Sequence, residues 1–240
     1  QLVPTTDREA VRELCRMTDS LDLIIPRGGE SLINAVIEMA LVPVIKHYKG
    51  ICHTYIDASA DLEMAWAIAE NAKCQRPGVC NAMETLLVHK EIAADFLPKM
   101  GALFHAQNVK LLGDSTCCQQ IPSAQPASEE DWYKEYLDLT LSIRVVDHIE
   151  SAIEHINHYG SGHSDAIVTQ DDTSEKQFLA EVDSSSVYVN ASTRFTDGAE
   201  FGMGAEIGIS TDKLHARGPM GLEELTTYKF VIEGTGQIRE

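Results

Sequence analysis

A cysteine on a loop between two regular elements is the first residue whose position suggests chemistry. Residues 71–81 read NAKCQRPGVCN, and Cys80 follows a loop with Pro and Gly and precedes an apolar run. A thiolate is a strong nucleophile when positive groups lower its pKa, and Lys73 and Arg76 are close in sequence. Free cysteines are also common as small buried apolar residues, so the spacing leaves a catalytic and a structural role open for Cys80.

A glycine pair is the second place where chemistry could occur. Gly28 and Gly29 lie between an apolar run and a segment with helical spacing. Glycines allow a ligand to approach the backbone closely, and the N–H groups at the start of the following helix can bind an anion. The segment is neither a GxGxxG fingerprint nor a Walker A loop, so a simple tight turn is the alternative interpretation.

A polar loop after the apolar run 186–190 is the third candidate. An arginine fork with hydroxyl and amide donors can hold a carboxylate or a phosphate, and the loop supplies Asn190, Ser192, Thr193 and Arg194. An ordinary surface loop is the alternative interpretation.

The cysteines and histidines do not form a pattern typical of a metal site. The 6 cysteines have irregular spacings with no CxxC pair, which favours free thiols in a reducing compartment over disulfides or zinc ligands. His155 and His158 are three residues apart on an expected helix, and we interpret them as a solvent-facing pair. The sequence therefore predicts no metal site.

The elements that must position these residues alternate between strands and helices. Short apolar or alternating runs predict strands over 21–25, 42–45, 52–56, 84–88, 139–146, 165–169 and 186–190. Helical spacing predicts helices over 31–40, 61–72, 92–100, 149–158 and 174–182, with Asp61 and Asp147 as N-terminal caps. Residues 113–130 are expected to form a loop, and 225–232 to be β-prone. This alternation is typical of a parallel, helix-covered α/β fold.

The composition limits the possible partners. The 240 residues are 44% apolar, which is enough for one domain or two small ones. Lys and Arg number 19 against 37 Asp and Glu, giving a formal net charge of −18, which repels nucleic acid. A small anion can still be bound by local Arg or N–H groups. No segment resembles a membrane span or a signal peptide, so we expect a cytoplasmic protein.

Four segments resemble the gamma-glutamyl phosphate reductase family of the aldehyde dehydrogenase superfamily. They are 22–29 (DLIIPRGG), 71–81, 183–198 (DSSSVYVNASTRFTDG) and 213–229 (KLHARGPMGLEELTTYK). The resemblance extends over nearly the whole chain. It implies an aldehyde-dehydrogenase-like, three-layer αβα fold with largely parallel sheets, incomplete at the N-terminus. It also implies that 1–50 are the second half of a Rossmann-like cofactor domain, 51–224 a catalytic domain and 225–240 an oligomerisation strand.

The resemblance further implies a reaction and its residues. Members reduce L-glutamate 5-phosphate with NADPH in proline biosynthesis, through a thioester on the cysteine that Cys80 matches. Gly28 and Gly29 match the turn at the cofactor phosphates, and Glu135 falls where the superfamily holds the nicotinamide ribose. Arg76 would lie near the phosphate, with Asn190, Ser192, Thr193 and Arg194 on the substrate side. A homo-oligomer is expected.

Two departures from the family pattern accompany the resemblance. Members have a further N-terminal portion before the point that matches Gln1. The stretch 44–50 (VIKHYKG) lacks the general-base Glu of hydrolytic aldehyde dehydrogenases, which suits an acyl-enzyme that must not be hydrolysed. The alternatives are another NAD(P)-dependent aldehyde dehydrogenase, or an inactive truncated fragment.

Overall fold

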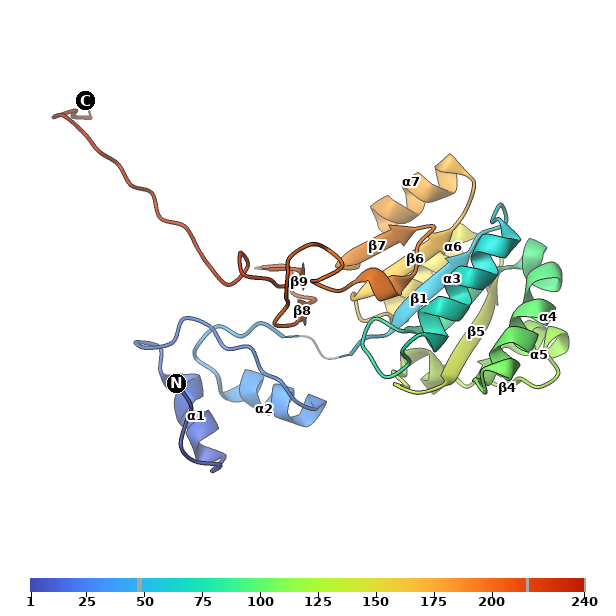
Figure 1. Cartoon of the computed structure of the whole chain (residues 1–240), viewed down its shortest axis with the longest axis horizontal. Coiled ribbons are helices and arrows are strands. Elements are labelled where there is room, and N and C mark those ends of the chain that lie inside the picture. The colour runs from blue at the N-terminus through green and yellow to red at the C-terminus, as the bar shows by residue number, and fades with distance from the viewer. Residues whose placement is uncertain (47–48, 215, 240) are drawn as a thin grey trace.

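The body of the protein is a single parallel sheet covered by helices on both faces (Figure 1). The structure is a computed structural model, and it describes residues 1–46, 49–214 and 216–239. Seven strands lie in the order β4-β3-β5-β2-β1-β6-β7, and every neighbouring pair is parallel. In chain order they are β1 (Cys52–Ile56), β2 (Met83–His89), β3 (Lys110–Gly113), β4 (Gln125–Pro126), β5 (Thr140–Val146), β6 (Ser164–Val168) and β7 (Ser186–Val189).

The helices form two layers because the sheet is apolar on both faces. One core cluster joins the sheet to α3 (Leu62–Cys74), α4 (Lys90–Ala106) and α5 (Ser115–Gln120). A second cluster joins the other face to α6 (Ile149–Tyr159) and α7 (Asp172–Glu181). The central strands β1 and β2 are buried along their whole length. This arrangement confirms the three-layer αβα fold.

The segments outside this body are less regular. The N-terminal part holds α1 (Glu9–Arg16) and α2 (Glu30–Met39), and it lies beside the sheet body in Figure 1. Short 3-10 turns lie at η1 (Glu129–Tyr133) and η2 (Thr193–Phe195), and β8 (Ile209–Ser210) pairs antiparallel with β9 (Gly218–Pro219). The C-terminal tail extends away from the body (Figure 1). No helix in these described ranges has both the length and the apolar character that crossing a membrane would need.

Several expected elements differ from the structure. Residues 21–25 and 42–45 form only one bridge, between Ile24 and Val44, since two short strands alone are marginally stable. The expected loop 113–130 instead contains α5, which Asp114 caps by accepting from the Cys117 N–H, and β4, which extends the sheet beside β3. Residues 225–232 form no strand and are largely exposed, because no neighbouring strand pairs with them.

Aspartates were expected to cap α3 and α6, and the structure shows an aspartate cap at α3 alone of these two. Asp61 accepts from the Met64 N–H at the start of α3, as predicted. At α6 the cap is His148, whose ring accepts from the Ser151 N–H, and the prediction of Asp147 is wrong. The Asp147 carboxylate instead pairs with Lys90 at 3.1 Å.

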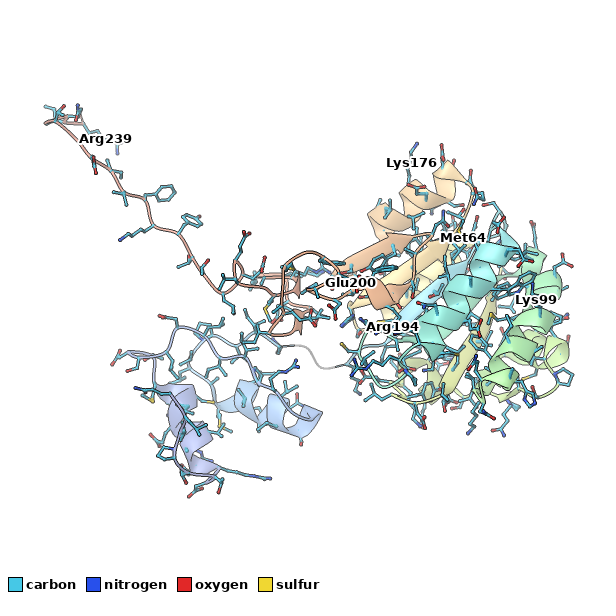
Figure 2. The ribbon with its side chains drawn as sticks, in the orientation of Figure 1. Met64, Lys99, Lys176, Arg194, Glu200 and Arg239 are labelled. Atoms are coloured by element: carbon cyan, nitrogen blue, oxygen red, sulfur yellow. The ribbon has the colours of Figure 1, made fainter. Side chains whose placement is uncertain are left out.

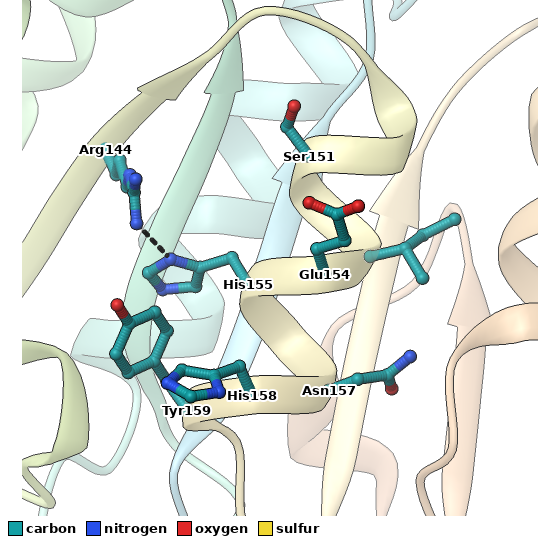
Figure 3. Close-up of a pocket in the computed structure, with 8 residues that line it drawn as sticks. Arg144, Ser151, Glu154, His155, Asn157, His158 and Tyr159 are labelled. Atoms are coloured by element: carbon teal, nitrogen blue, oxygen red, sulfur yellow. Dashed lines mark hydrogen bonds between the residues drawn. The ribbon is translucent and has the colours of Figure 1, made fainter.

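His155 is buried, which contradicts its interpretation as a solvent-facing residue. Only 3% of the His155 surface is exposed. Its ring lies beside Arg144 and Tyr159 (Figure 3), and the three residues line a surface pocket of about 730 Å³. The Arg144 guanidinium donates to its Nδ1 at 2.9 Å. Because arginine can only donate, the His155 ring is neutral with its proton on Nε2. Burial and the nearby cations lower the pKa of His155 to about 2.

We therefore expect His155 to make the fold sensitive to mild acid. A histidine whose pKa is lowered in the folded state gives its full stabilisation above its unfolded pKa and loses it as the pH falls. Between pH 7 and 5.5 the wild type should lose about 1 kcal/mol more unfolding free energy than His155→Phe, measured by urea denaturation. The exposed His148→Phe is the matched control and should follow the wild type. Parallel pH profiles for the wild type and His155→Phe would contradict this.

Candidate active site

Cys80 lies at the amino-terminal ends of the parallel strands, on the loop between the end of α3 and the start of β2. Two other segments reach this edge, namely Gly50 just before β1 and Glu135 before β5. The Glu135 carboxylate accepts from the Gly50 N–H at 2.7 Å. Because β2 lies between β5 and β1 in the sheet, this bond links the segments on either side of the Cys80 loop.

The backbone of Gly50 packs directly on the backbone of Cys80. A Cβ at position 50 would lie 1.9 Å from the Cys80 carbonyl oxygen, so no other residue fits there without a backbone shift. The buried Cys52 thiol donates to the same carbonyl at 3.2 Å. The β1–β2 register shifts between Cys52 and His53, next to this contact. Together these contacts hold the peptide that follows the Cys80 side chain.

The loop after β7 forms hydrogen bonds with Asn81, the residue that follows Cys80. The Asn81 amide donates to the Thr196 carbonyl at 2.8 Å, and the Thr193 hydroxyl donates to the Asn81 carbonyl at 2.7 Å. Ser192 is also buried, and its hydroxyl accepts from the Arg194 N–H at 3.3 Å. Ser192 and Thr193 thus hold the loop in place, and their side chains are engaged within the protein.

Arg194 is the member of this loop whose charged group faces the site. Its Nε donates to the Gln75 carboxamide at 2.9 Å, and it lines a cavity of about 190 Å³ together with Gln75 and Glu200. Figure 2 shows Arg194 and Glu200 on the side of the body nearer the N-terminal segment. The pKa of Arg194 is lowered by burial and by the charge of Arg76, so these two guanidinium groups are neighbours.

Asn190 lies at the carboxyl-terminal ends of the strands, whereas Cys80 lies at their amino-terminal ends. It follows the carboxyl end of β7, with φ of 54°, and its amide makes two hydrogen bonds to the backbone of Thr169, which follows β6. The Asn190 oxygen accepts at 3.0 Å and the nitrogen donates at 2.9 Å. The structure therefore does not bring Asn190 together with the other expected site residues.

The Cys80 thiol is not activated in this state. Burial first, and then the carboxylates of Glu135 and Glu206, raise its pKa to about 11. Its own backbone N–H and the Arg27 guanidinium lower the pKa, but less. The thiol is therefore protonated near neutral pH, and a further positive group or a change in the site is needed to form the thiolate.

A buried ion pair connects the Cys80 loop to the Glu135 segment. The Lys73 ammonium on α3 lies 2.6 Å from the Glu84 carboxylate on β2, and both side chains are fully buried. Glu84 also accepts from the Leu137 N–H at 3.1 Å. Burial raises the pKa of Glu84 to about 7, against the opposing effect of Lys73. The pair thus bridges the two ends of the Cys80 loop.

Of the glycine pair, Gly29 leaves the start of α2 open, whereas a Cβ on Gly28 would lie 2.7 Å from Cδ2 of Leu32. Gly29 is the N-terminal cap of α2, with no side-chain cap hydrogen bond, and no atom lies within 4 Å of a Cβ built there. The free N–H groups and the absence of a side chain fit the approach of a phosphate group. Within the described ranges, no cluster of three or more His, Cys, Asp or Glu could hold a metal ion.

Four residues at this site were not expected from the sequence, namely Arg27, Gly50, Glu84 and Glu206. Arg27 stands beside Gly28, inside a segment that the sequence singles out. The other three gave no local signal, because their roles depend on contacts with residues far away in the chain.

Comparison with known proteins identifies relatives over the whole chain. The chain is 60% identical over 240 residues to gamma-glutamyl phosphate reductase from Moorella thermoacetica, matching 100% of this chain and 57% of that protein. The crystal structure of gamma-glutamyl phosphate reductase from Thermotoga maritima is 50% identical, with a TM-score of 0.97, over 99% of this chain and 57% of that one. The chain thus spans little more than half the length of these relatives. No protein-family model matches it.

A more distant structure shares the fold. An acetylating aldehyde dehydrogenase from Geobacillus thermoglucosidasius has a TM-score of 0.69 at 18% identity, over 99% of this chain and 61% of that one. The chain therefore has the aldehyde-dehydrogenase-like fold that its sequence predicted.

Gly50→Ala should destabilise the protein more than an alanine at Gly78 on the Cys80 loop. The new Cβ must displace the Cys80 carbonyl, so we expect a loss of at least about 3 kcal/mol in urea denaturation. Gly78→Ala is the matched control, because the nearest atom to its Cβ is the Leu137 oxygen at 3.6 Å, an ordinary contact. Equal stability of the two variants would show that the close approach at Gly50 is not a constraint.

Lys73→Met should leave Glu84 as an unpaired buried charge and cost about 3–5 kcal/mol at pH 8. The loss should shrink at pH 5, where the raised pKa of Glu84 allows it to take up a proton. The double variant Lys73→Met/Glu84→Leu should recover most of the stability, again by urea denaturation. A double variant as unstable as the single one would assign the loss to packing instead.

Proposed function

We propose that this chain, which belongs to the gamma-glutamyl phosphate reductase family, carries the nucleophile of an enzyme that reduces L-glutamate 5-phosphate to L-glutamate 5-semialdehyde and phosphate. The observation that carries the proposal is Cys80, held on a rigid loop by Gly50 and Cys52. The 60% identity to the Moorella protein supports the choice of substrate and the place in proline biosynthesis.

The first step is transfer of the acyl group to Cys80. The thiolate attacks the acyl carbon of the acyl phosphate, a C–S bond forms, and the C–O bond to the phosphate breaks. Phosphate leaves with the electron pair of that bond. The thioester keeps the acyl carbon activated, because a thiolate is both a good nucleophile and a good leaving group.

The negative charge that develops on the acyl oxygen needs hydrogen-bond donors. The Cys80 backbone N–H, which lowers the pKa of its own thiol and therefore lies near the sulfur, is one such donor. Arg76 and Arg194 lie together on the side of the site that would bind the anionic substrate. Because Ser192, Thr193 and Asn190 are bonded within the protein, their proposed part is to hold the Arg194 loop and the sheet edge rather than to contact substrate.

The proposed cofactor is NADPH, and the residues present fit it at one point. The turn at Gly28 and Gly29, open at Gly29, suits the cofactor phosphates, and Glu135 lies close enough to Cys80 to hold the nicotinamide ribose. When bound, NADPH would supply a hydride to the acyl carbon and become NADP⁺. With a proton, the thioester on Cys80 would then become a thiohemiacetal, which releases the aldehyde and restores the thiol. Hydrolysis of the thioester is disfavoured because the stretch 44–50 has no Glu to activate water, although 47–48 lie outside the described residues.

We also propose a cytoplasmic homo-oligomer in which residues 225–240 contact another copy. The tail carries exposed apolar side chains, namely Leu225, Tyr228, Phe230, Val231, Ile232 and Ile238. Exposed apolar side chains in series are typical of a surface that is covered in an assembly.

Acyl transfer can be tested on this chain directly. Incubation with acetyl phosphate should add one acetyl group, located at Cys80 by peptide mapping and removed by hydroxylamine, as intact-mass spectrometry can measure. Cys80→Ser should lose the hydroxylamine-sensitive adduct, and the neighbouring Cys74→Ser should keep it. An adduct that survives in Cys80→Ser would overturn the assignment.

The substrate class is tested in the reverse direction. L-Glutamate 5-semialdehyde should be oxidised with NADP⁺ only when inorganic phosphate is present, measured by the absorbance of NADPH. Phosphate-independent oxidation of simple aldehydes would favour another aldehyde dehydrogenase. Acylation of Cys80 without any hydride transfer would favour a fragment that lacks part of its cofactor site.

A further inference from the structure

A small cavity beside the Cys80 loop is lined by two opposite charges that do not pair with each other. Its volume is about 190 Å³, and its lining residues are Asn71, Gln75, Arg194, Phe195 and Glu200. The Arg194 guanidinium and the Glu200 carboxylate thus line the same space (Figure 2). The ion pairs among the described residues nevertheless include neither of them. A cavity with two separate opposite charges suits a ligand that carries both charges itself.

Both ends of the Cys80 loop are bonded to Arg194. At the start of the loop, the Gln75 carboxamide oxygen accepts from Nε of Arg194 at 2.9 Å. At the end of the loop, the Asn81 amide donates to the Arg194 carbonyl at 3.4 Å. Cys80 stands between Gln75 and Asn81 in the chain, so the cavity opens beside the loop that carries the thiol.

The contact with Gln75 decides which donors of Arg194 can bind a ligand. This hydrogen bond uses Nε and fixes the plane of the guanidinium, which leaves its two terminal nitrogens for other partners. Two neighbouring N–H donors in one plane match the two oxygens of a carboxylate. The Glu200 carboxylate lies on the exposed rim of the same cavity, where it can accept from an ammonium group.

We propose that this cavity binds the α-amino-acid head group of the substrate, with Arg194 on the α-carboxylate and Glu200 on the α-ammonium group. This rests on the proposed function, because it assigns the end of L-glutamate 5-phosphate that does not react. The two charged groups of the substrate stand on one carbon atom, so a small cavity with both signs of charge can bind them together. The methylene groups then lead from the cavity to the acyl carbon at Cys80.

This assignment makes Glu200 a specificity-determining residue. An exposed carboxylate at the entrance repels an anionic substrate, and the chain as a whole carries 37 acidic residues against 19 basic ones. An ammonium group on the substrate turns this repulsion into attraction. Glu200 therefore favours an amino acid over a dicarboxylate of the same length, such as glutarate, which differs from L-glutamate only by lacking the amino group.

Protection of Cys80 from iodoacetamide measures head-group binding without a cofactor. The probes are L-glutamate and glutarate, and the rate is read at Cys80 by peptide mapping, since Cys74 and Cys118 are also partly exposed. In the wild type we expect L-glutamate to protect at a concentration about five- to twentyfold lower than glutarate. Glu200→Gln should raise the protecting concentration of L-glutamate by a similar factor, without raising that of glutarate.

Two further variants complete the design. Arg194→Gln should raise the protecting concentration of both probes, because both carry the carboxylate that Arg194 binds. Glu13→Gln removes an exposed carboxylate from α1 and should behave like the wild type. Protection by glutarate in Glu200→Gln shows that this variant is folded. Equal protection by the two probes in the wild type, no protection by L-glutamate, or unchanged L-glutamate protection in Glu200→Gln would each overturn the proposal.

The outcomes separate this inference from the proposed function. If acetyl phosphate acylates Cys80 in the wild type but L-glutamate protection does not depend on Glu200, the function stands and the head-group site is wrong. If Cys80 is not acylated but L-glutamate protection depends on Glu200, the head-group site stands and the acyl-transfer function is wrong.

Discussion

The approach of the Gly50 backbone to the Cys80 carbonyl is the constraint on which the rest of the site depends. The segment that enters β1 must pass under the nucleophile loop with no side chain in between, since a Cβ there would lie 1.9 Å from the carbonyl oxygen. The same residue donates its N–H to Glu135, and Cys52, two residues later, donates to the same carbonyl. One short segment therefore sets the position of Cys80 relative to both neighbouring strands.

This crowding determines the electrostatics of the site. A loop packed so closely is poorly solvated, and burial is the largest cause of the raised Cys80 pKa. The surrounding carboxylates add to it. A cysteine in this state is protected from unwanted reactions and requires positive charge to become a thiolate. The Arg27 guanidinium opposes the raised pKa of Cys80, but less strongly than burial and the carboxylates raise it.

The regular elements could be predicted from the sequence because local patterns decide them. The apolar run 52–56 and the spacing of 61–72 correspond to β1 and α3, since burial on both sheet faces and one-sided helix burial leave clear periodicities. Predictions failed where a distant partner decided the outcome. His155 is buried because its ring packs against Arg144 and Trp132, which lie outside α6, and residues 21–25 form one bridge because they lack a second partner strand.

The sequence by itself determined the layered α/β fold, the nucleophile candidate and the family, because these depend on residue type and on order along the chain. Which candidates meet was decided only by the tertiary structure. Three expected site residues stand within four positions of Arg194 in sequence, but their contacts differ. Thr193 bonds to Asn81, and Ser192 bonds within its own loop. Asn190 bonds to Thr169 at the carboxyl-terminal ends of the strands. Gly50 and Glu135 are distant from Cys80 in sequence, yet they meet beside it. The physical reason is that neighbouring parallel strands all begin at the same end of the sheet, so the segments that precede them meet there wherever they stand in the chain.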